Sequence, residues 1–91
     1  MGFVVQYLSG DVAVAFKHGV EFDDILHGLR FAVVVEEVGE DPTRYLVLGP
    51  GTSGDLLEIA ILDDSSGPIV IHAMKMRSKY EPLLTEGMDS Q

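Results

Sequence analysis

Four apolar, β-branched segments follow one another between Arg30 and Ala73, and they constrain the fold more than any other feature of the chain. The segments are RFAVVVEEV (30–38), TRYLVLG (43–49), GDLLEIAILD (54–63) and GPIVIHA (67–73). They are separated by GEDP, PGTSG and DDSSG, which are compositions typical of turns. Because short connections join neighbouring strands that run in opposite directions, the sequence predicts a four-stranded antiparallel meander.

The residues before the meander predict one more strand and two helices. FVVQYL (3–8) is β-branched and aromatic, which favours a strand, and a short helix is expected over 11–18 with Gly19 as its stop. A second helix follows, with two aspartates in its first turn, where the helix dipole favours anions. Its apolar residues recur at helical spacing and are Phe22, Ile25, Leu26 and Leu29.

A last helix is predicted after the meander. Apolar residues at helical spacing extend from Ala73 to Leu84, and Pro82 is expected to end or kink this helix near Tyr80. Residues 85–91 show no pattern and are expected to form a flexible tail. The chain is therefore predicted to be one α+β domain over 1–84, with two layers. Its antiparallel meander sheet of four to five strands packs with two N-terminal helices and one C-terminal helix.

Composition restricts the possible partners. Six Lys and Arg residues against fifteen Asp and Glu residues give a formal charge of −9, which opposes non-specific attraction to nucleic acid or an anionic membrane and favours a basic protein partner. The chain has no cysteine, and its three histidines are scattered, so we expect no disulfide, metal site or cofactor. No apolar run approaches the roughly 20 residues of a membrane span, so we expect a cytoplasmic protein without membrane contact.

Half of the positive charge lies close together, at Lys75, Arg77 and Lys79. On the predicted last helix, Lys75 and Lys79 share a stripe that His72 would join, and Arg77 lies on the opposite border of the apolar arc. Arg and Lys stabilise charge on phosphate oxygens and His transfers protons near neutral pH, so this set suits phosphodiester chemistry. Alternatively, these residues are a solvated helix face, on which Arg77 pairs with Glu81. Both interpretations treat the cations as exposed, so their replacement is expected to leave the fold intact.

Several segments together resemble the BrnT-like toxins of type II toxin–antitoxin pairs. They are KHGVEF (17–22), RYLVLGPGTSGDLLEIAIL (44–62) and HAMKMRSKYE (72–81), and the resemblance spans residues 17–84. It implies a RelE-like α+β fold, metal-independent endoribonuclease activity against messenger RNA, and a cognate antitoxin that covers the active face. Messenger RNA or the ribosome would be further partners, and no direct contact with DNA is expected.

The resemblance also implies the site residues. The expected catalytic residues are Arg44, His72, Arg77 and Lys79, and the expected substrate contacts are Lys17, His18, Lys75 and Tyr80. The last helix is expected to form a positive patch next to Lys17 or Arg44. Alternatively, Lys17 and His18 are the polar end of a helix and Arg44 is a surface residue, and His27 receives no role.

This chain departs from the family pattern in three ways. It has no tryptophan, it carries Met74 where the family commonly has arginine after the closing alanine, and it is much less basic. Nucleases need a positive groove, so the charge of −9 favours an alternative function. In that alternative the chain is a non-catalytic protein-binding module of the same fold that has lost RNA cleavage.

Overall fold

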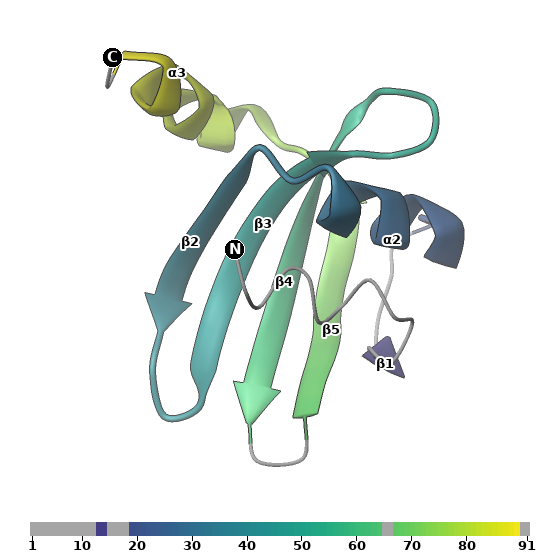
Figure 1. Cartoon of the computed structure of the whole chain (residues 1–91), viewed down its shortest axis with the longest axis vertical. Coiled ribbons are helices and arrows are strands. Elements are labelled where there is room, and N and C mark those ends of the chain that lie inside the picture. Colours follow the sequence, from purple (N-terminus) through teal and green to yellow (C-terminus); the bar gives the residue numbers. More distant parts are fainter. Residues whose placement is uncertain (1–12, 15–18, 65–66, 90–91) are drawn as a thin grey trace.

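The computed structural model describes residues 13–14, 19–64 and 67–89, and its central element is a five-stranded sheet (Figure 1). The strands are β1 (Ala13–Val14), β2 (Val34–Gly39), β3 (Thr43–Pro50), β4 (Leu56–Asp64) and β5 (Gly67–Lys75). Their order in the sheet is β1-β5-β4-β3-β2, with β1 parallel to β5 and all other neighbours antiparallel. The predicted four-stranded antiparallel meander is therefore confirmed as β2 to β5.

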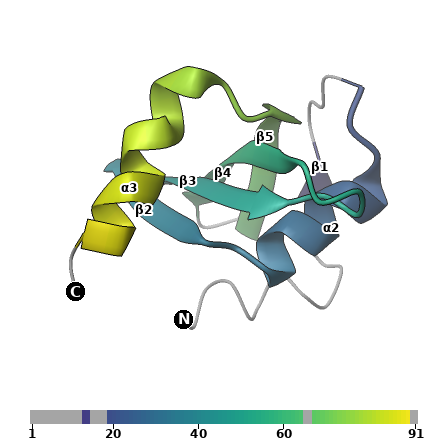
Figure 2. The same ribbon diagram turned by 90° about the horizontal axis from the view of Figure 1, so that it is seen from above.

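The helices lie on opposite sides of this sheet. Helix α2 (Phe22–Arg30) covers the face of β3 and β4, whereas the short 3-10 helix η1 (Ser78–Tyr80) and helix α3 (Glu81–Asp89) lie beyond the other face, where α3 contacts β2 (Figure 2). Helix α2 confirms the predicted second helix, because its apolar spacing and its acidic first turn agree with its position on the sheet. The fold class is α+β.

The hydrophobic core lies between α2 and the sheet. Ile25 and Leu29 of α2 are fully buried against residues that alternate along the strands. The buried strand residues are Val47, Leu57, Ile59, Ile61, Val70 and Ala73. Full burial of a side chain of this size contributes about 1.5–3 kcal/mol, so this face is the main source of stability.

Helix α2 approaches β3 closely because two glycines meet there. A Cβ atom built on Gly49 would collide with the backbone carbonyl of Gly28, and a Cβ atom on Gly28 would lie 3.0 Å from Cδ1 of Ile59.

We expect Gly49→Ala to lower the free energy of unfolding by about 2–3 kcal/mol, because α2 must move away from the sheet. Urea denaturation would measure this. Gly54→Ala is the control, because a Cβ atom at this position meets no neighbouring atom. The variant should lose only the stability that a positive φ of 95° costs an alanine. Equal losses for both variants would show that the contact between the glycines is unimportant.

Two expectations about helices were wrong. Ala13 and Val14 form a strand and not part of a helix over 11–18, while FVVQYL and the rest of 11–18 lie outside the described residues. Residues 73–75 continue β5, because Leu57 pairs with Lys75 and Ile59 with Ala73. The predicted helix over HAMKMRSKY therefore does not exist.

The C-terminal helix begins where the sequence predicted an end. Pro82 is the second residue of α3, a position at which its missing N–H group is not needed. Helix α3 continues to Asp89, so regular structure extends into the segment that was expected to be a flexible tail. The spacing of apolar residues misled the prediction, because the apolar residues from Ala73 to Leu84 belong to more than one element. They are divided among the end of β5, the segment between β5 and η1, the 3-10 helix η1 and helix α3.

Candidate functional site

Glu58 is the buried charged residue of the core strands. It lies in the middle of β4 on the face away from α2, opposite Leu48 of β3 and Met74 of β5, and it is 1% exposed. An ionised carboxylate in such a place is stable only when it is paired and hydrogen-bonded. The groups that satisfy Glu58 therefore define a site.

Arg77 is the principal partner of Glu58. Its backbone N–H donates to Oε1 at 2.9 Å, its Nε lies 3.0 and 3.1 Å from Oε1 and Oε2, and its Nη2 donates to Oε2 at 2.6 Å. Met76 continues the ladder beyond β5 by donating its N–H to the carbonyl of Leu56, which brings Arg77 over the carboxylate. This two-pronged geometry is the strongest arrangement of a guanidinium and a carboxylate. The Arg77 side chain remains 47% exposed.

His72 is the second partner. Its Nε2 lies 3.0 Å from Oε2 of Glu58, and its side chain is 27% exposed. The regular pairing of β4 with β5 in this region makes the contact possible, because Ala60 pairs with His72 and Glu58 with Met74, so His72 and Glu58 lie on the same face. The irregularity of β5 lies beyond this contact, where Ile61 pairs with Val70 and one inserted residue reverses the alternation of side chains.

Two residues of η1 extend the site. Nζ of Lys79 lies 5.1 Å from the centre of the Tyr80 ring, and Cζ of Arg77 lies 5.8 Å from the same centre. Tyr80 therefore holds both cations against its ring by cation–π contacts. We call this set, Glu58, His72, Arg77, Lys79 and Tyr80, the Glu58 cluster.

The cluster is not negative, although the chain is. Burial by itself raises the pKa of Glu58, but the hydrogen bonds from the Arg77 side chain and backbone, and then from His72, outweigh burial and lower it to about 2. The same contact with Glu58 raises the pKa of Arg77. Glu58 and Arg77 are thus both charged at neutral pH and offset each other. Lys79 leaves the cluster with a net positive charge.

The low pKa of Glu58 predicts a pH dependence of stability. A carboxyl group whose folded pKa of about 2 lies below its usual value of 4.5 stabilises the protein above pH 4.5, and this contribution is lost as pH falls toward 2. The difference corresponds to about 3 kcal/mol. Urea denaturation between pH 6 and pH 2 would measure the loss. Glu58→Gln should show a flatter profile in this window, and an unchanged profile would contradict the role of Glu58.

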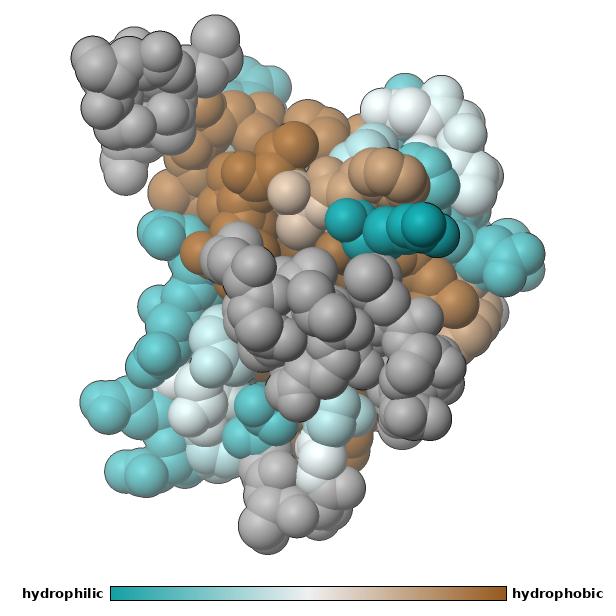
Figure 3. All heavy atoms as spheres, viewed as in Figure 1, coloured by the Kyte–Doolittle hydropathy of each residue, from teal (hydrophilic) through white to brown (hydrophobic). Residues whose placement is uncertain are grey.

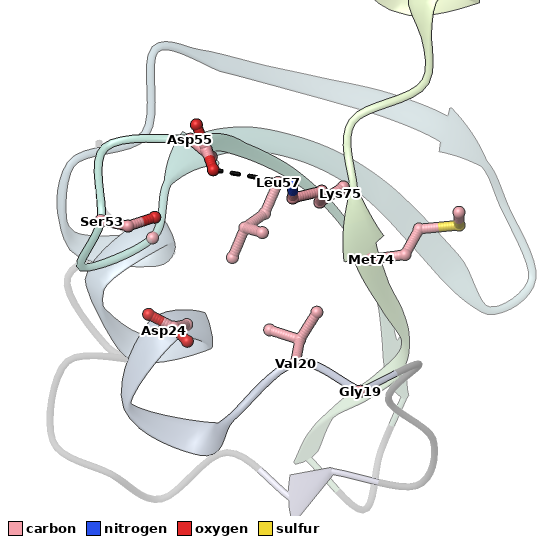
Figure 4. Close-up of a pocket in the computed structure, with 9 residues that line it drawn as sticks. Gly19, Val20, Asp24, Ser53, Asp55, Leu57, Met74 and Lys75 are labelled. Atoms are coloured by element: carbon pink, nitrogen blue, oxygen red, sulfur yellow. Dashed lines mark ion pairs between the residues drawn. The ribbon is translucent and has the colours of Figure 1, made fainter.

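Lys75 lies away from the cluster. It pairs across the sheet with Leu57 of the core, so it faces the α2 side of β5, where His72 does not point. Its Nζ lies 3.7 Å from Oδ2 of Asp55, and both side chains are largely exposed. They border a cleft of about 430 Å³ at the end of the sheet, which Asp24 also lines (Figure 4). The predicted stripe of His72, Lys75 and Lys79 is therefore wrong, because residues 67–75 are a strand.

Arg44 and the cluster lie at opposite ends of the same face. Arg44 pairs with Leu62, whereas Leu48 on the same strand pairs with Glu58, which separates Arg44 from Glu58 by about 13 Å along the strand. The Arg44 side chain lies over Gly39. The structure thus does not bring Arg44 together with Arg77. Lys17 and His18, the other residues of the predicted composite patch, lie outside the described residues.

Sequence reasoning missed Glu58, although a signal was present. LLEIAIL (56–62) contains a single carboxylate within an apolar strand, and such a residue is rarely buried without a partner.

His27 also makes an unexpected contact, because its Nδ1 lies 2.7 Å from the carbonyl oxygen of Pro50 and must donate to it. This bond ties α2 to the end of β3.

In the part of the chain that the structure describes, no group of three or more His, Asp or Glu side chains is placed to hold a metal ion. No helix of that part is both long enough and apolar enough to cross a bilayer. The chain matched no model of a protein family, no curated protein and no solved structure. Function is therefore inferred from the Glu58 cluster.

Proposed function

We propose that the chain is the toxin of a type II toxin–antitoxin pair, with a RelE-like fold and metal-independent endoribonuclease activity against messenger RNA. The observation that supports this proposal is the position of His72, because Glu58 contacts both its imidazole and the guanidinium of Arg77. The ammonium group of Lys79 lies against the same Tyr80 ring as that guanidinium. Cleavage of RNA by its own 2′-hydroxyl needs a proton acceptor and cations near the phosphate.

The residues of the cluster suit the steps of this reaction. The contact of Nε2 with Glu58 orients the imidazole of His72, which is the group that takes up the proton in this proposal. The 2′-hydroxyl loses its proton to His72, its oxygen attacks the adjacent phosphorus, and the bond from phosphorus to the 5′-oxygen breaks. The 5′-oxygen takes up a proton from water and His72 returns its proton to the solvent, which leaves a 2′,3′-cyclic phosphate and a 5′-hydroxyl.

The remaining members of the cluster act on charge and binding. Arg77 and Lys79 stabilise the negative charge that builds on the phosphate oxygens, and both are exposed enough to face a ligand. The Tyr80 ring, with cations on it, offers a surface on which a base can stack. A cognate antitoxin would cover the cluster with acidic or aromatic groups and so block the reaction.

A second candidate function has its own support. Arg77 uses both Nε and Nη2 on Glu58, so its cation already has an anion, and the chain as a whole carries a charge of −9. Both features favour a non-catalytic protein-binding module in which the Glu58 cluster supports the fold and contributes to a docking surface.

Incubation of the purified protein with messenger RNA at low salt, with and without ribosomes, separates the two candidates. We expect fragments that end in 2′,3′-cyclic phosphate, and growth arrest when the protein is expressed without its antitoxin. Cleavage should weaken steeply as salt rises, because a few local cations act against a repulsive overall field. Intact RNA under all these conditions, together with harmless expression, would contradict the nuclease and favour the binding module.

A further inference from the structure

Strand β2 is an edge of the sheet with unusual exposure of large hydrophobic side chains. Among the described residues, the exposed large hydrophobics are Phe31 (51%), Val33 (60%) and Val38 (58%). All three lie on β2 or in the residues that lead into it. Phe31 and Val33 lie just before the start of β2 and Val38 lies near its end, so exposed apolar groups occur at both ends of this edge strand.

The backbone of β2 can accept another strand. In the described sheet β2 pairs with β3 alone, so every second residue directs its N–H and C=O groups away from the sheet. Helix α3 also contacts β2 (Figure 2). Natural proteins usually protect such an edge, and a peptide strand that pairs with it gains main-chain hydrogen bonds.

The surface next to the start of β2 is hollowed and carries both apolar and polar side chains. A cleft of about 420 Å³ lies there, lined by the apolar residues Leu26 and Phe31 and by the polar residues Asp23, His27, Arg30 and Thr52. Figure 3 shows hydrophobic surface in the region between α2 and α3, and hydrophilic groups along the lower margin, where β2 ends. An apolar side chain of a partner strand would be buried against Phe31 and Val33.

The charge of the edge determines the kind of partner. Glu36 and Glu37 are adjacent and exposed on opposite faces of β2, and Glu40 and Asp41 follow in the turn, with Arg44 as the nearby cation. If β2 paired antiparallel with β2 of a second copy about its centre, these carboxylates would oppose one another, which is unfavourable. A basic strand would instead place a cation beside each carboxylate.

We propose that β2 is the docking edge for an extended, basic segment of another polypeptide. The segment adds a strand beside β2, with two consecutive Lys or Arg residues next to Glu36 and Glu37 and an apolar residue against Phe31 and Val33. This inference does not depend on RNA cleavage, because the edge and the Glu58 cluster share no residue.

Titration of ¹⁵N-labelled protein with a blocked peptide of sequence VTVKRVTV tests the proposal. We expect amide shifts concentrated in residues 34–39 and binding in the submillimolar range. The acidic peptide VTVEEVTV should bind at least about tenfold more weakly, because it lacks the positive charge. The basic peptide with alternate amides N-methylated should also bind at least about tenfold more weakly, because it lacks N–H groups that would donate to β2. No shifts in β2, or equal binding of the N-methylated peptide, would overturn the proposal.

Variants of the protein provide the matched comparison. Glu36→Gln with Glu37→Gln should weaken binding of the basic peptide about tenfold, whereas Glu21→Gln with Glu81→Gln removes the same charge elsewhere and should have little effect. Equal losses in the two double variants would show attraction by net charge alone and contradict a site at β2. Shifts in β2 that depend on protein concentration without peptide would show that a second copy occupies the edge, which also overturns the proposal.

Discussion

Replacement of Arg77 by alanine is expected to lower the free energy of unfolding by about 3 kcal/mol. Glu58 is 1% exposed, and Arg77→Ala removes the guanidinium that donates to both of its carboxylate oxygens. Removal of one partner of a buried pair costs about 3–5 kcal/mol, and the lower end applies because the Arg77 side chain is 47% exposed. Urea denaturation at pH 7 would measure the change.

Two controls isolate the effect of the unpaired carboxylate. Lys79→Ala removes a neighbouring exposed cation and should change stability by less than about 0.5 kcal/mol. Glu58→Leu combined with Arg77→Ala removes both charges and should recover most of the loss, because a well-packed apolar residue replaces a buried ion. If Arg77→Ala were as stable as the unaltered protein, water would satisfy Glu58 and the pair would not support the fold.

The contact between Arg77 and Glu58 corrects the interpretation of Arg77 that was made from sequence. As a residue of a solvated helix, Arg77 would pair with Glu81, and its loss would leave the fold intact. The partner is instead Glu58, which is far away in the sequence and lies in the centre of the sheet. A loss of function in Arg77→Ala can therefore result from unfolding, so this residue is unsuitable for a first test of the chemistry.

The predicted parts of the fold were those that local patterns determine. Helix α2 has its apolar residues at helical spacing, and β2 to β5 are apolar runs between turn sequences, so each can be found in a short window. The segment after Ala73 could not be predicted in this way. Residues 73–75 match helical spacing as well, but pairing of β5 with β4 satisfies their backbone, and this partner lies outside the window.

The Glu58 cluster was predicted only in part for a similar reason. His72, Arg77 and Lys79 were identified from their chemistry and Tyr80 was expected as a substrate contact, but the geometry that joins them was not predicted. The contact between His72 and Glu58 depends on the register in which β5 pairs with β4, and nothing in GPIVIHA indicates that register. Arg44 was included by resemblance, and its distance from Glu58 becomes clear only when the strands are paired.

His72→Ala is expected to reduce RNA cleavage by about a hundredfold or more. Loss of a general base typically costs 10²–10⁴ in rate, and no other imidazole among the described residues contacts Glu58. The rate of appearance of 2′,3′-cyclic phosphate ends would measure the loss. Stability should fall by only about 1 kcal/mol, because Arg77 still pairs with the carboxylate. The comparison should be made at a temperature where both proteins are folded.

His27→Gln is the matched control for this experiment. His27 lies on α2, on the other side of the sheet, and glutamine can still donate a hydrogen bond to the carbonyl of Pro50, so cleavage should be unchanged. Lys79→Ala should slow cleavage about tenfold and reduce its dependence on salt, because one phosphate contact is lost. If His72→Ala cleaved RNA as fast as the unaltered protein, the Glu58 cluster would not be the catalytic site. If His27→Gln were equally impaired, the losses would reflect disturbance of the fold, since the two imidazoles contact different elements.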